Sequence, residues 1–277
     1  MKNILSFDIE EHFQVSGLEA AVKREDWERH SSRVENNTRK VLDILSRHNV
    51  RATFFVLGWI GRKFPKLIKD IFALGHEIAS HGFDHQLVYR MTADQFKGDV
   101  LISLEILQNI TGEKIIGFRA PSFSLAADDL VKFQALAELG IKYDSSLFPM
   151  KHFRYADAAG VPTYPHEIRI GSQTILREFP MTVVGFLGRR IPAGGGGYFR
   201  LYPDFFIRRN FLKVNSENRP VVIYLHPWEF DPDQPRIKGA GIGNTFRHYH
   251  NLHKTAGKLE KSLKEFKFGP FRDHLAI

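Results

Sequence analysis

Acidic, imidazole and guanidinium side chains stand at the ends of several apolar runs that are expected to form strands. The residues concerned are Asp8 and Glu10 after the first run, His81 and His85 after the third, Arg119 at the end of the fourth, and His226 after a later one. In parallel α/β folds the carboxyl ends of the strands meet at one face, where catalytic groups collect. We therefore expect these side chains to share one cavity, although the first and the last lie more than two hundred positions apart.

The segment from His81 to His85 has the spacing of a metal-binding pair. Two imidazoles four residues apart can bind one ion from a helix or from a tight turn, and Gly82 permits the turn. In an isolated pair of this kind, one imidazole is commonly exposed while the other caps a loop. Because the chain has no cysteine, any metal must be bound by histidines and carboxylates.

The acidic residues after the first run can complete such a site. Residues at i and i+2 of a strand face the same side, so Asp8 and Glu10 can point into one pocket while Ile9 packs behind them. Two carboxylates this close are costly unless a cation or a shared proton relieves their repulsion. A solvated acidic loop is the alternative for Glu11, but it does not suit Asp8, which ends an apolar strand.

His226 and Arg119 fit the two remaining tasks of a hydrolytic site. An imidazole with a pKa near neutrality can deliver a proton to a leaving group, although His226 beside Pro227 could equally be a core residue. A fixed guanidinium at Arg119 can keep a carboxylate ionised, and a surface ion pair is the alternative.

The pattern of apolar residues indicates strands and helices in alternation. Expected strands are 3–9, 51–57, 76–80, 115–118, 141–144 and 221–225, and expected helices are 32–48, 65–74, 92–111 and 128–139. The strands are apolar on both faces, which is typical of a parallel sheet covered by helices. The pattern leaves open whether the sheet closes into an incomplete barrel or is doubly wound.

The second half of the chain departs from this alternation. Residues 150–218 are rich in proline and glycine with short β-like runs, and we interpret them as an irregular insertion rather than a separate domain. An amphipathic helix is expected at about 244–268. The chain is thus expected to form a single catalytic domain over residues 1–277.

Composition limits the classes of partner. The net charge of +8 favours encounter with acidic partners such as nucleic acid, anionic lipid or an acidic polysaccharide. The expected C-terminal helix carries many of the lysines, but no nucleic-acid-binding motif accompanies it, so a nucleic-acid partner is not expected. No apolar run is long enough for a membrane span, and early acidic residues argue against a secretory signal. A cytoplasmic location follows as the expectation, with association with the envelope left open.

Taken in order, these motifs resemble those of the polysaccharide deacetylases with a NodB-type domain, carbohydrate esterase family 4. The matching positions are Asp8, His81, His85, Arg119, Pro121, Leu225 and His226. Other stretches are similar to the subgroup encoded with bacterial exopolysaccharide biosynthesis. These stretches are 8–13, 195–200, 224–232 and 247–249. The resemblance implies an incomplete, distorted (β/α) barrel of about seven strands.

The resemblance also implies a chemistry. One divalent ion, with Zn²⁺ expected, would be bound by Glu10, His81 and His85, and an N-acetylated hexosamine in a surface or exopolysaccharide would be hydrolysed. Asp8 would be the base, His226 the acid and Arg119 the residue that orients Asp8. The residues expected to bind substrate are Phe123, Tyr198, Arg200 and Trp228.

This sequence departs from the common family pattern at two motifs. Ile9 stands where the family's second aspartate usually binds the metal, which makes Glu10 the expected ligand and leaves Glu11 as the alternative. The supporting aspartate of the family's fourth motif has only Asp144 as a candidate.

Two other functions remain open from the sequence. One is hydrolysis of small cyclic or linear amides on the same fold, which would need a narrow cleft and no metal. The other is a glycan-binding relative without catalysis, against which the retention of both Asp8 and His226 argues.

Overall fold

The computed structural model describes residues 1–150 and 155–275, and its centre is a mostly parallel sheet. The first strand, β1 (Lys2–Ile9), has both of its sides buried. Leu5, Phe7 and Ile9 pack into the larger core cluster together with apolar residues of the surrounding helices. Ile4 belongs to a second cluster with residues of other strands, so the other side of β1 faces the interior that the strands enclose.

The strands follow one another in an open path. Its order is β10-β1-β2-β3-β4-β5-β7-β6, with β11 paired to β1 and with β6 as the antiparallel edge strand. The strands after β1 are β2 (Thr53–Val56), β3 (Glu77–Ser80), β4 (Gly117–Phe118), β5 (Tyr143–Asp144), β6 (His166–Ile170), β7 (Gln173–Glu178), β10 (Val222–Leu225) and β11 (Lys267–Gly269). A separate hairpin consists of β8 (Val183–Phe186) and β9 (Arg189–Pro192).

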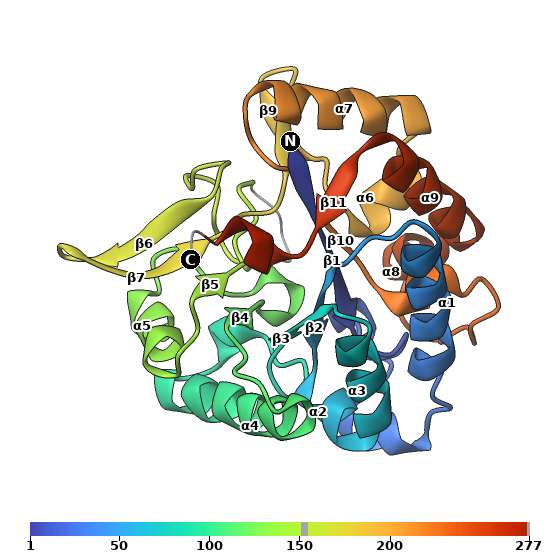
Figure 1. Cartoon of the computed structure of the whole chain (residues 1–277). Coiled ribbons are helices and arrows are strands. Elements are labelled where there is room, and N and C mark those ends of the chain that lie inside the picture. Colours follow the sequence, from blue (N-terminus) through green and yellow to red (C-terminus); the bar gives the residue numbers. More distant parts are fainter. Residues whose placement is uncertain (151–154, 276–277) are drawn as a thin grey trace.

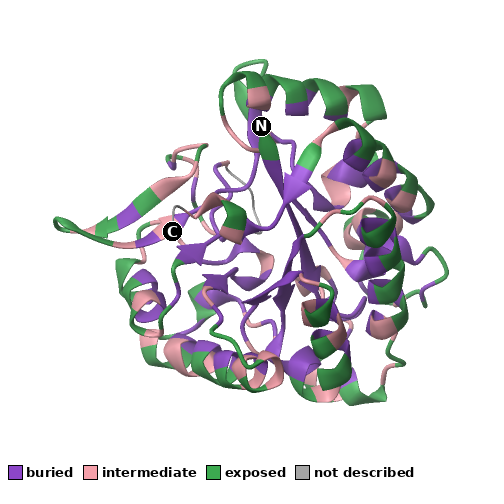
Figure 2. Cartoon of the chain, in the orientation of Figure 1, coloured by how far each residue is buried: buried purple, intermediate pink, exposed green. Residues whose placement is uncertain are grey.

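Helices surround this sheet (Figure 1). They are α1 (Val34–Arg47), α2 (Gly58–Lys63), α3 (Pro65–Ala73), α4 (Ala93–Thr111), α5 (Leu130–Glu138), α6 (Gly196–Leu201), α7 (Asp204–Ser216), α8 (Ile242–Tyr249) and α9 (Thr255–Glu265). Figure 2 shows buried strands at the centre and exposed outer faces on the helices. Helix α4 starts as its sequence predicts, because Thr92 and Gln95 form a reciprocal capping box.

The predicted incomplete α/β barrel is confirmed, with differences in its second half. Within the described residues, the main sheet has nine strands rather than about seven, because β6 and β11 extend it. The segment expected to be an irregular insertion supplies β7, which pairs with β5, as well as helices α6 and α7. Instead of one helix at about 244–268, the chain forms α8 and α9, because Asn251 has a left-handed φ of 56° between them.

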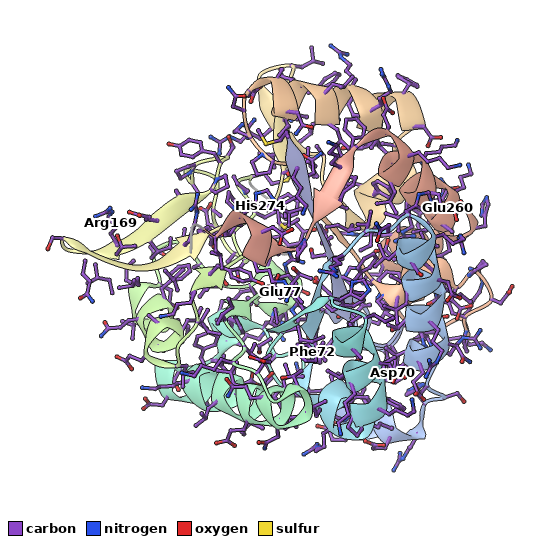
Figure 3. The ribbon with its side chains drawn as sticks, viewed as in Figure 1. Asp70, Phe72, Glu77, Arg169, Glu260 and His274 are labelled. Carbon is purple, nitrogen blue, oxygen red and sulfur yellow. The ribbon has the colours of Figure 1, made fainter. Side chains whose placement is uncertain are left out.

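The amino ends of the strands are closed by the C-terminal segment. Glu77 lies near the middle of the view in Figure 3, whereas Arg169 and Glu260 lie at the periphery. The Glu77 carboxylate accepts hydrogen bonds from Thr53 at 2.5 Å, Tyr143 at 3.0 Å and the backbone N–H of Arg272 at 3.1 Å. This network fills one end of the barrel.

Among the described residues, no helix is both long and apolar enough to cross a membrane.

Candidate active site

Strand β1 brings its two acidic residues to the carboxyl end of the barrel. Asp8 pairs with Phe55 of β2 in the sheet, and Glu10 follows directly after the strand. Both side chains are buried and both line one pocket. The i, i+2 spacing therefore places two carboxylates on the same side, as the sequence predicts.

Arg119 fixes the orientation of Asp8. Its side chain is fully buried, and Nη1 donates to Asp8 Oδ1 at 2.7 Å and to Ser6 Oγ at 2.9 Å. The other guanidinium nitrogens donate to the carbonyl of Ser145 at 3.1 Å and to its hydroxyl at 3.0 Å. A buried, charge-assisted contact of this kind fixes the carboxylate in one orientation. Arg119 is thus a positioning residue inside the site and not part of a surface ion pair.

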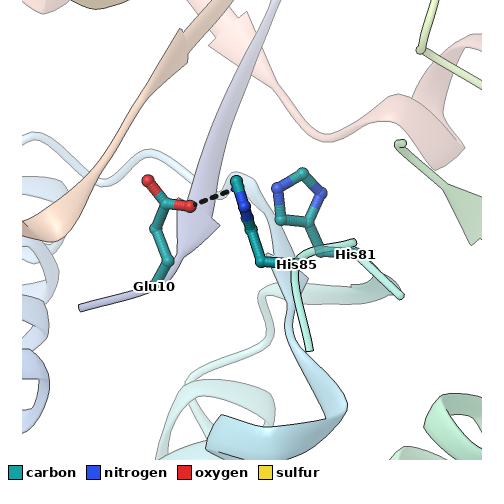
Figure 4. A group of neighbouring side chains, drawn as sticks. All are labelled: Glu10, His81 and His85. Atoms are coloured by element: carbon teal, nitrogen blue, oxygen red, sulfur yellow. Dashed lines mark ion pairs between the residues drawn. The ribbon is translucent and has the colours of Figure 1, made fainter. Parts of the chain in front are cut away.

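Glu10, His81 and His85 form a candidate metal centre (Figure 4). One ligand atom from each residue lies within 4.8 Å of the other two, and all three residues are buried. Nδ1 of His81 contacts the carbonyl oxygen of Arg119 at 2.8 Å, which leaves Nε2 as the free ring nitrogen. Burial lowers the pKa of His81 to about 4, so the imidazole is neutral, as a metal ligand must be.

Glu10 carries the negative charge of this cluster. Its Oε2 is a buried oxygen without a hydrogen-bond partner, and it lies 2.9 Å from His85 Nε2. Burial would raise the pKa of Glu10, but His85, His226 and His81 together lower it to about 2. An ionised carboxylate whose oxygen lacks a hydrogen-bond partner, together with two imidazoles, forms the kind of donor set that catalytic zinc sites use. The residues present therefore fit a divalent ion.

The turn between the two histidines is held from α4. The N–H of Phe83 donates to Asp99 Oδ2 at 2.9 Å, and a Cβ at Gly82 would lie 2.8 Å from the same oxygen. Gly82 and His85 both have positive φ, of 74° and 59°, and His85 is a non-glycine residue in this region. The two histidines therefore lie on a constrained turn. The sequence alone left a helix and a tight turn as alternatives.

Glu11 lies apart from this cluster. Its carboxylate accepts from the backbone N–H groups of Arg33 at 3.0 Å and Val34 at 3.3 Å, and also from the hydroxyl of Ser32. These donors precede or begin α1, so Glu11 binds unpaired N–H groups at a helix start. Of the two glutamates, Glu10 is the one that the structure places beside His81 and His85.

His226 faces the carboxylates from the end of β10. Its Nε2 lies 3.5 Å from Glu10 Oε1 and 3.9 Å from Asp8 Oδ2. Burial alone would lower the pKa of His226, but the carboxylates of Glu10, Glu229 and Asp8 raise it to about 9. The imidazole is therefore protonated at neutral pH and can act as an acid.

Glu229 is a site residue that our sequence analysis missed. Its Oε1 accepts from Nδ1 of His226 at 2.8 Å and from the backbone N–H of His226 at 3.0 Å. Its Oε2 accepts from Nε of Arg200 at 2.6 Å. A signal was present, because Pro227 follows His226 and a glutamate stands three positions on, which is the spacing of a capped helical turn.

Arg200, which we expected to bind substrate, lines the pocket, and its hydrogen bonds in the structure go to groups of the protein. It is buried, and besides Glu229 it donates to the carbonyls of Arg247 at 2.9 Å, His248 at 3.0 Å and His250 at 2.6 Å. The guanidinium N–H groups of Arg200 therefore donate to acceptors within the protein. Burial would raise the pKa of Glu229, but Arg200 and His226 lower it below its usual value. Arg200 therefore favours the ionised form of Glu229.

Trp228 also contributes differently from a free sugar-stacking ring. Its indole N–H donates to Glu10 Oε1 at 3.0 Å, and its ring stacks on His226 at 5.0 Å and on His248 at 4.2 Å between centroids. It lines the pocket while holding three polar groups in place. His248 was not singled out as a site residue by our sequence analysis.

The other two aromatic residues expected to bind substrate lie in different places. Phe123 lines the pocket, with a left-handed φ of 54° and its ring against Tyr155 and Tyr224. Tyr198 is half-buried on α6 and does not line that pocket, although Arg247 lies 5.7 Å from the centre of its ring. Phe123 thus remains a candidate contact and Tyr198 is more remote.

Asp144 does not support His226. Its carboxylate accepts from the hydroxyl of Ser146 at 2.6 Å and from the N–H of the same residue at 2.9 Å. It pairs in the sheet with Glu178, which is a second buried carboxyl group. The support that we sought at Asp144 is given by Glu229 instead.

Comparison with known families divides the chain in two. Residues 26–143 match the polysaccharide deacetylase family, and residues 145–276 match a domain of unknown function, DUF3473. The first match contains His81, His85 and Arg119, and the second contains His226 and Glu229. The pocket is therefore built from both matched regions and from the first strand, which precedes them.

Curated relatives align over parts of their length. A peptidoglycan-N-acetylglucosamine deacetylase of Bacillus cereus is 39% identical over 75 residues, which is 27% of each chain. A peptidoglycan deacetylase of Helicobacter pylori is 29% identical over 144 residues, which is 50% of this chain and 47% of that protein. A peptidoglycan-N-acetylmuramic acid deacetylase of Bacillus subtilis is 40% identical over 77 residues, 28% of this chain and 29% of that protein. The chain thus spans between about a quarter and a half of these relatives.

Solved structures with the same fold match nearly the whole chain. A candidate polysaccharide deacetylase from Mycobacterium smegmatis has a TM-score of 0.62 at 17% identity and covers 99% of this chain and 90% of its own. A carbohydrate esterase family 4 pseudoenzyme from Bacillus anthracis has a TM-score of 0.50 at 14% identity and covers 98% of this chain and 65% of its own. Identities this low show the fold alone.

The fold and the pocket define an incomplete α/β barrel with a buried His–His–carboxylate cluster at the carboxyl ends of its strands. Together with the family match, these features show that the chain contains a polysaccharide deacetylase domain of the NodB type, from carbohydrate esterase family 4. The predicted resemblance to the polysaccharide deacetylase family is confirmed, and the similarity to the exopolysaccharide-associated subgroup stays a prediction.

Proposed function

We propose that this protein is a metal-dependent hydrolase that removes N-acetyl groups from hexosamine residues of a cell-surface or exopolysaccharide. The observation that carries the proposal is that a carboxylate and an imidazole face each other beside a candidate metal centre. Asp8 Oδ2 and His226 Nε2 lie 3.9 Å apart, beside Glu10, His81 and His85. Relatives named as peptidoglycan deacetylases support N-deacetylation of a glycan. We also propose that both matched regions form one catalytic domain.

The chain's own residues divide the reaction into two proton transfers. Asp8, oriented by Arg119, accepts a proton from the water that attacks the acetamide carbonyl. His226 donates its proton to the nitrogen as the C–N bond breaks, so acetate and a free amine are released. Glu10, His81 and His85 would hold the divalent ion, with Zn²⁺ expected, which would supply Lewis acidity and lower the pKa of a bound water.

Neither alternative function gains support from a specific observation. A glycan-binding protein without catalysis has no need of a base and an acid in contact, although the fold itself occurs in a pseudoenzyme. Relatives named for glycan deacetylation do not favour a small-amide hydrolase. A cytoplasmic location, with association with the envelope, remains a prediction that fractionation of cells can check.

Acetate release from N-acetylated oligosaccharides tests the proposal. We expect release by the purified protein, its loss with a chelator, and a fall in turnover of about 100-fold or more for Asp8→Asn. Asp70→Asn makes the same chemical change on the outer surface of α3 and should retain activity. Release that is unaffected by Asp8→Asn would reassign the base, and no release from any substrate would reject the function.

A further inference from the structure

One arginine in the pocket wall lacks a carboxylate partner. Arg247, on α8, lines the same pocket as Asp8 and Glu10. Within residues 1–150 and 155–275, no carboxylate oxygen lies within 4.0 Å of its nitrogens, whereas surface arginines such as Arg24, Arg47 and Arg208 have carboxylate partners within that distance. The two other arginines described at this site, Arg119 and Arg200, pair with acidic residues at 2.7 Å and 2.6 Å.

The surroundings of Arg247 are phenolic. Nη2 donates to the hydroxyl of Tyr155 at 2.7 Å, and the guanidinium carbon lies 5.9 Å from the Tyr155 ring centre and 5.7 Å from that of Tyr198. A guanidinium has five N–H donors, so one bond to a phenol leaves donors for another acceptor. A half-buried cation without an anion is costly to keep, and an anionic ligand would offset that cost.

The acidic residues of the pocket are not available for this task. Asp8 is bound by Arg119, and Glu10 lies between His85, His226 and Trp228. These are the two carboxylates among the described residues that line the pocket. The pocket thus combines a reaction centre with a separate cationic site.

Aromatic rings connect the two parts of the pocket. The Tyr155 ring lies 5.4 Å from Phe123, Phe123 lies 4.8 Å from Tyr224, and Tyr224 lies 5.7 Å from His226, all measured between ring centres. This continuous wall gives a sugar a surface between the proton donor and Arg247. A glycan bound at the reaction centre can therefore extend along the wall to the guanidinium.

We propose that Arg247 binds a carboxylate of the glycan, so that the preferred substrate is an acidic N-acetylated polysaccharide. This inference rests on the proposed function and specifies its substrate class. The planar guanidinium matches the two oxygens of a carboxylate, which gives orientation as well as affinity. The carboxylate has two chemical sources: a uronic acid next to the acetylated hexosamine, or a lactyl ether on that hexosamine itself.

Binding to the metal-free protein and acetate release by the metal-loaded protein test the inference separately. The ligands are a neutral N-acetylglucosamine tetramer, an oligosaccharide alternating N-acetylglucosamine with glucuronic acid, and one containing N-acetylmuramic acid. Methyl esters of the two acidic ligands remove their charge with little change in shape. Calorimetry gives Kd for each ligand, and the ligand with the larger acid-to-ester preference identifies the source of the carboxylate.

We expect one acidic ligand to bind about 10-fold or more tightly than its ester, with a preference that weakens as salt rises. Arg247→Gln should abolish most of this preference, and Arg247→Lys should keep part of it, because lysine retains charge without the planar fork. Arg236→Gln is the matched control, since Arg236 is exposed and does not line the pocket. Circular dichroism and thermal unfolding verify that each variant is folded.

The outcomes separate the substrate class from the reaction. Equal affinity of the wild type for acid and ester, or a preference retained in Arg247→Gln, would overturn the carboxylate site even if acetate is released. Acid-selective binding that depends on Arg247 without acetate release from any ligand would support the carboxylate site and reject the deacetylase function. If Arg247→Gln does not fold, the wild-type comparison and Arg247→Lys still decide the question, since each can show the absence of a preference.

Discussion

Replacing Glu229 by glutamine should change the acid strength of His226 more than the shape of the site. Glutamine keeps an oxygen that can accept from Nδ1 of His226, which now lies 2.8 Å from the carboxylate. It removes the negative charge that, with Glu10 and Asp8, counters the effect of burial on His226. Arg200 loses its carboxylate partner but keeps the three backbone carbonyls to which it donates.

The size of the effect follows from the distances. A carboxylate in hydrogen-bond contact raises the pKa of an imidazole by about 1 to 3, so Glu229→Gln should lower the pKa of His226 from about 9 to about 7. At pH 8 the protonated fraction would then fall from about nine-tenths to about one-tenth, a loss of roughly 10-fold in the acid form. At pH 6 the loss should be small, because the imidazole remains mostly protonated.

NMR titration of imidazole nitrogens in the metal-free protein measures the pKa of His226 directly. The pH dependence of kcat/KM gives the second readout, in which the basic limb should move to lower pH. Glu217→Gln removes an exposed carboxylate from the end of α7 and should leave both readouts unchanged. A pKa of His226 that stays within about 0.5 of the wild-type value in Glu229→Gln would refute the reasoning.

Three further changes test other parts of the structure. Glu10→Gln should weaken the binding of a divalent ion by about 100-fold or more in calorimetry. Glu11→Gln should mainly lower the melting temperature, because Glu11 binds N–H groups at the start of α1. Equal metal affinities of the two variants would reject Glu10 as the ligand. Asp99→Ala should weaken the same binding by about 10- to 100-fold through the turn that it holds, with exposed Asp94→Ala on the same helix as the control. Burial lowers the pKa of His76 from 6.5 to about 4, so its contribution to stability is present above pH 6.5 and is lost as pH falls toward 4, by up to about 3 kcal/mol. The free energy of unfolding in urea should therefore differ less between pH 7 and pH 4.5 in His76→Gln than in the wild type. An unchanged difference between the two pH values would contradict this origin.

Most of what could be predicted about the site came from the position of polar residues at the carboxyl ends of apolar strands. Asp8 and His226 end strands that are apolar on both faces, and parallel strands bring such ends together whatever their separation in sequence. The structure places them 3.9 Å apart. The choice between Glu10 and Glu11 was harder, because it depends on where α1 begins relative to the loop after β1, and single-residue spacing does not contain that information.

The supporting residues could not be found in the same way. The family resemblance implied that Arg200 binds substrate, and this stays a prediction. Its partners in the structure are Glu229 and the carbonyls at the end of α8, an arrangement that exists only after β10 and α8 have packed together. Likewise, the helical periodicity of 244–268 continues across Asn251, whose left-handed φ separates α8 from α9. Tertiary contacts decide these details, whereas local pattern decides the elements.

Two buried arginines support the two residues that are proposed to transfer protons in the pocket. Arg119 contacts Asp8, the proposed base, directly and fixes its orientation, with 2.7 Å between Nη1 and Oδ1. Arg200 acts through Glu229: it lowers the pKa of that carboxyl group, and the ionised Glu229 then favours the protonated form of His226. Arg119 belongs to the deacetylase match and Arg200 to the domain of unknown function, so in the proposed mechanism the second region sets the charge state of the acid that works with the first region's residues.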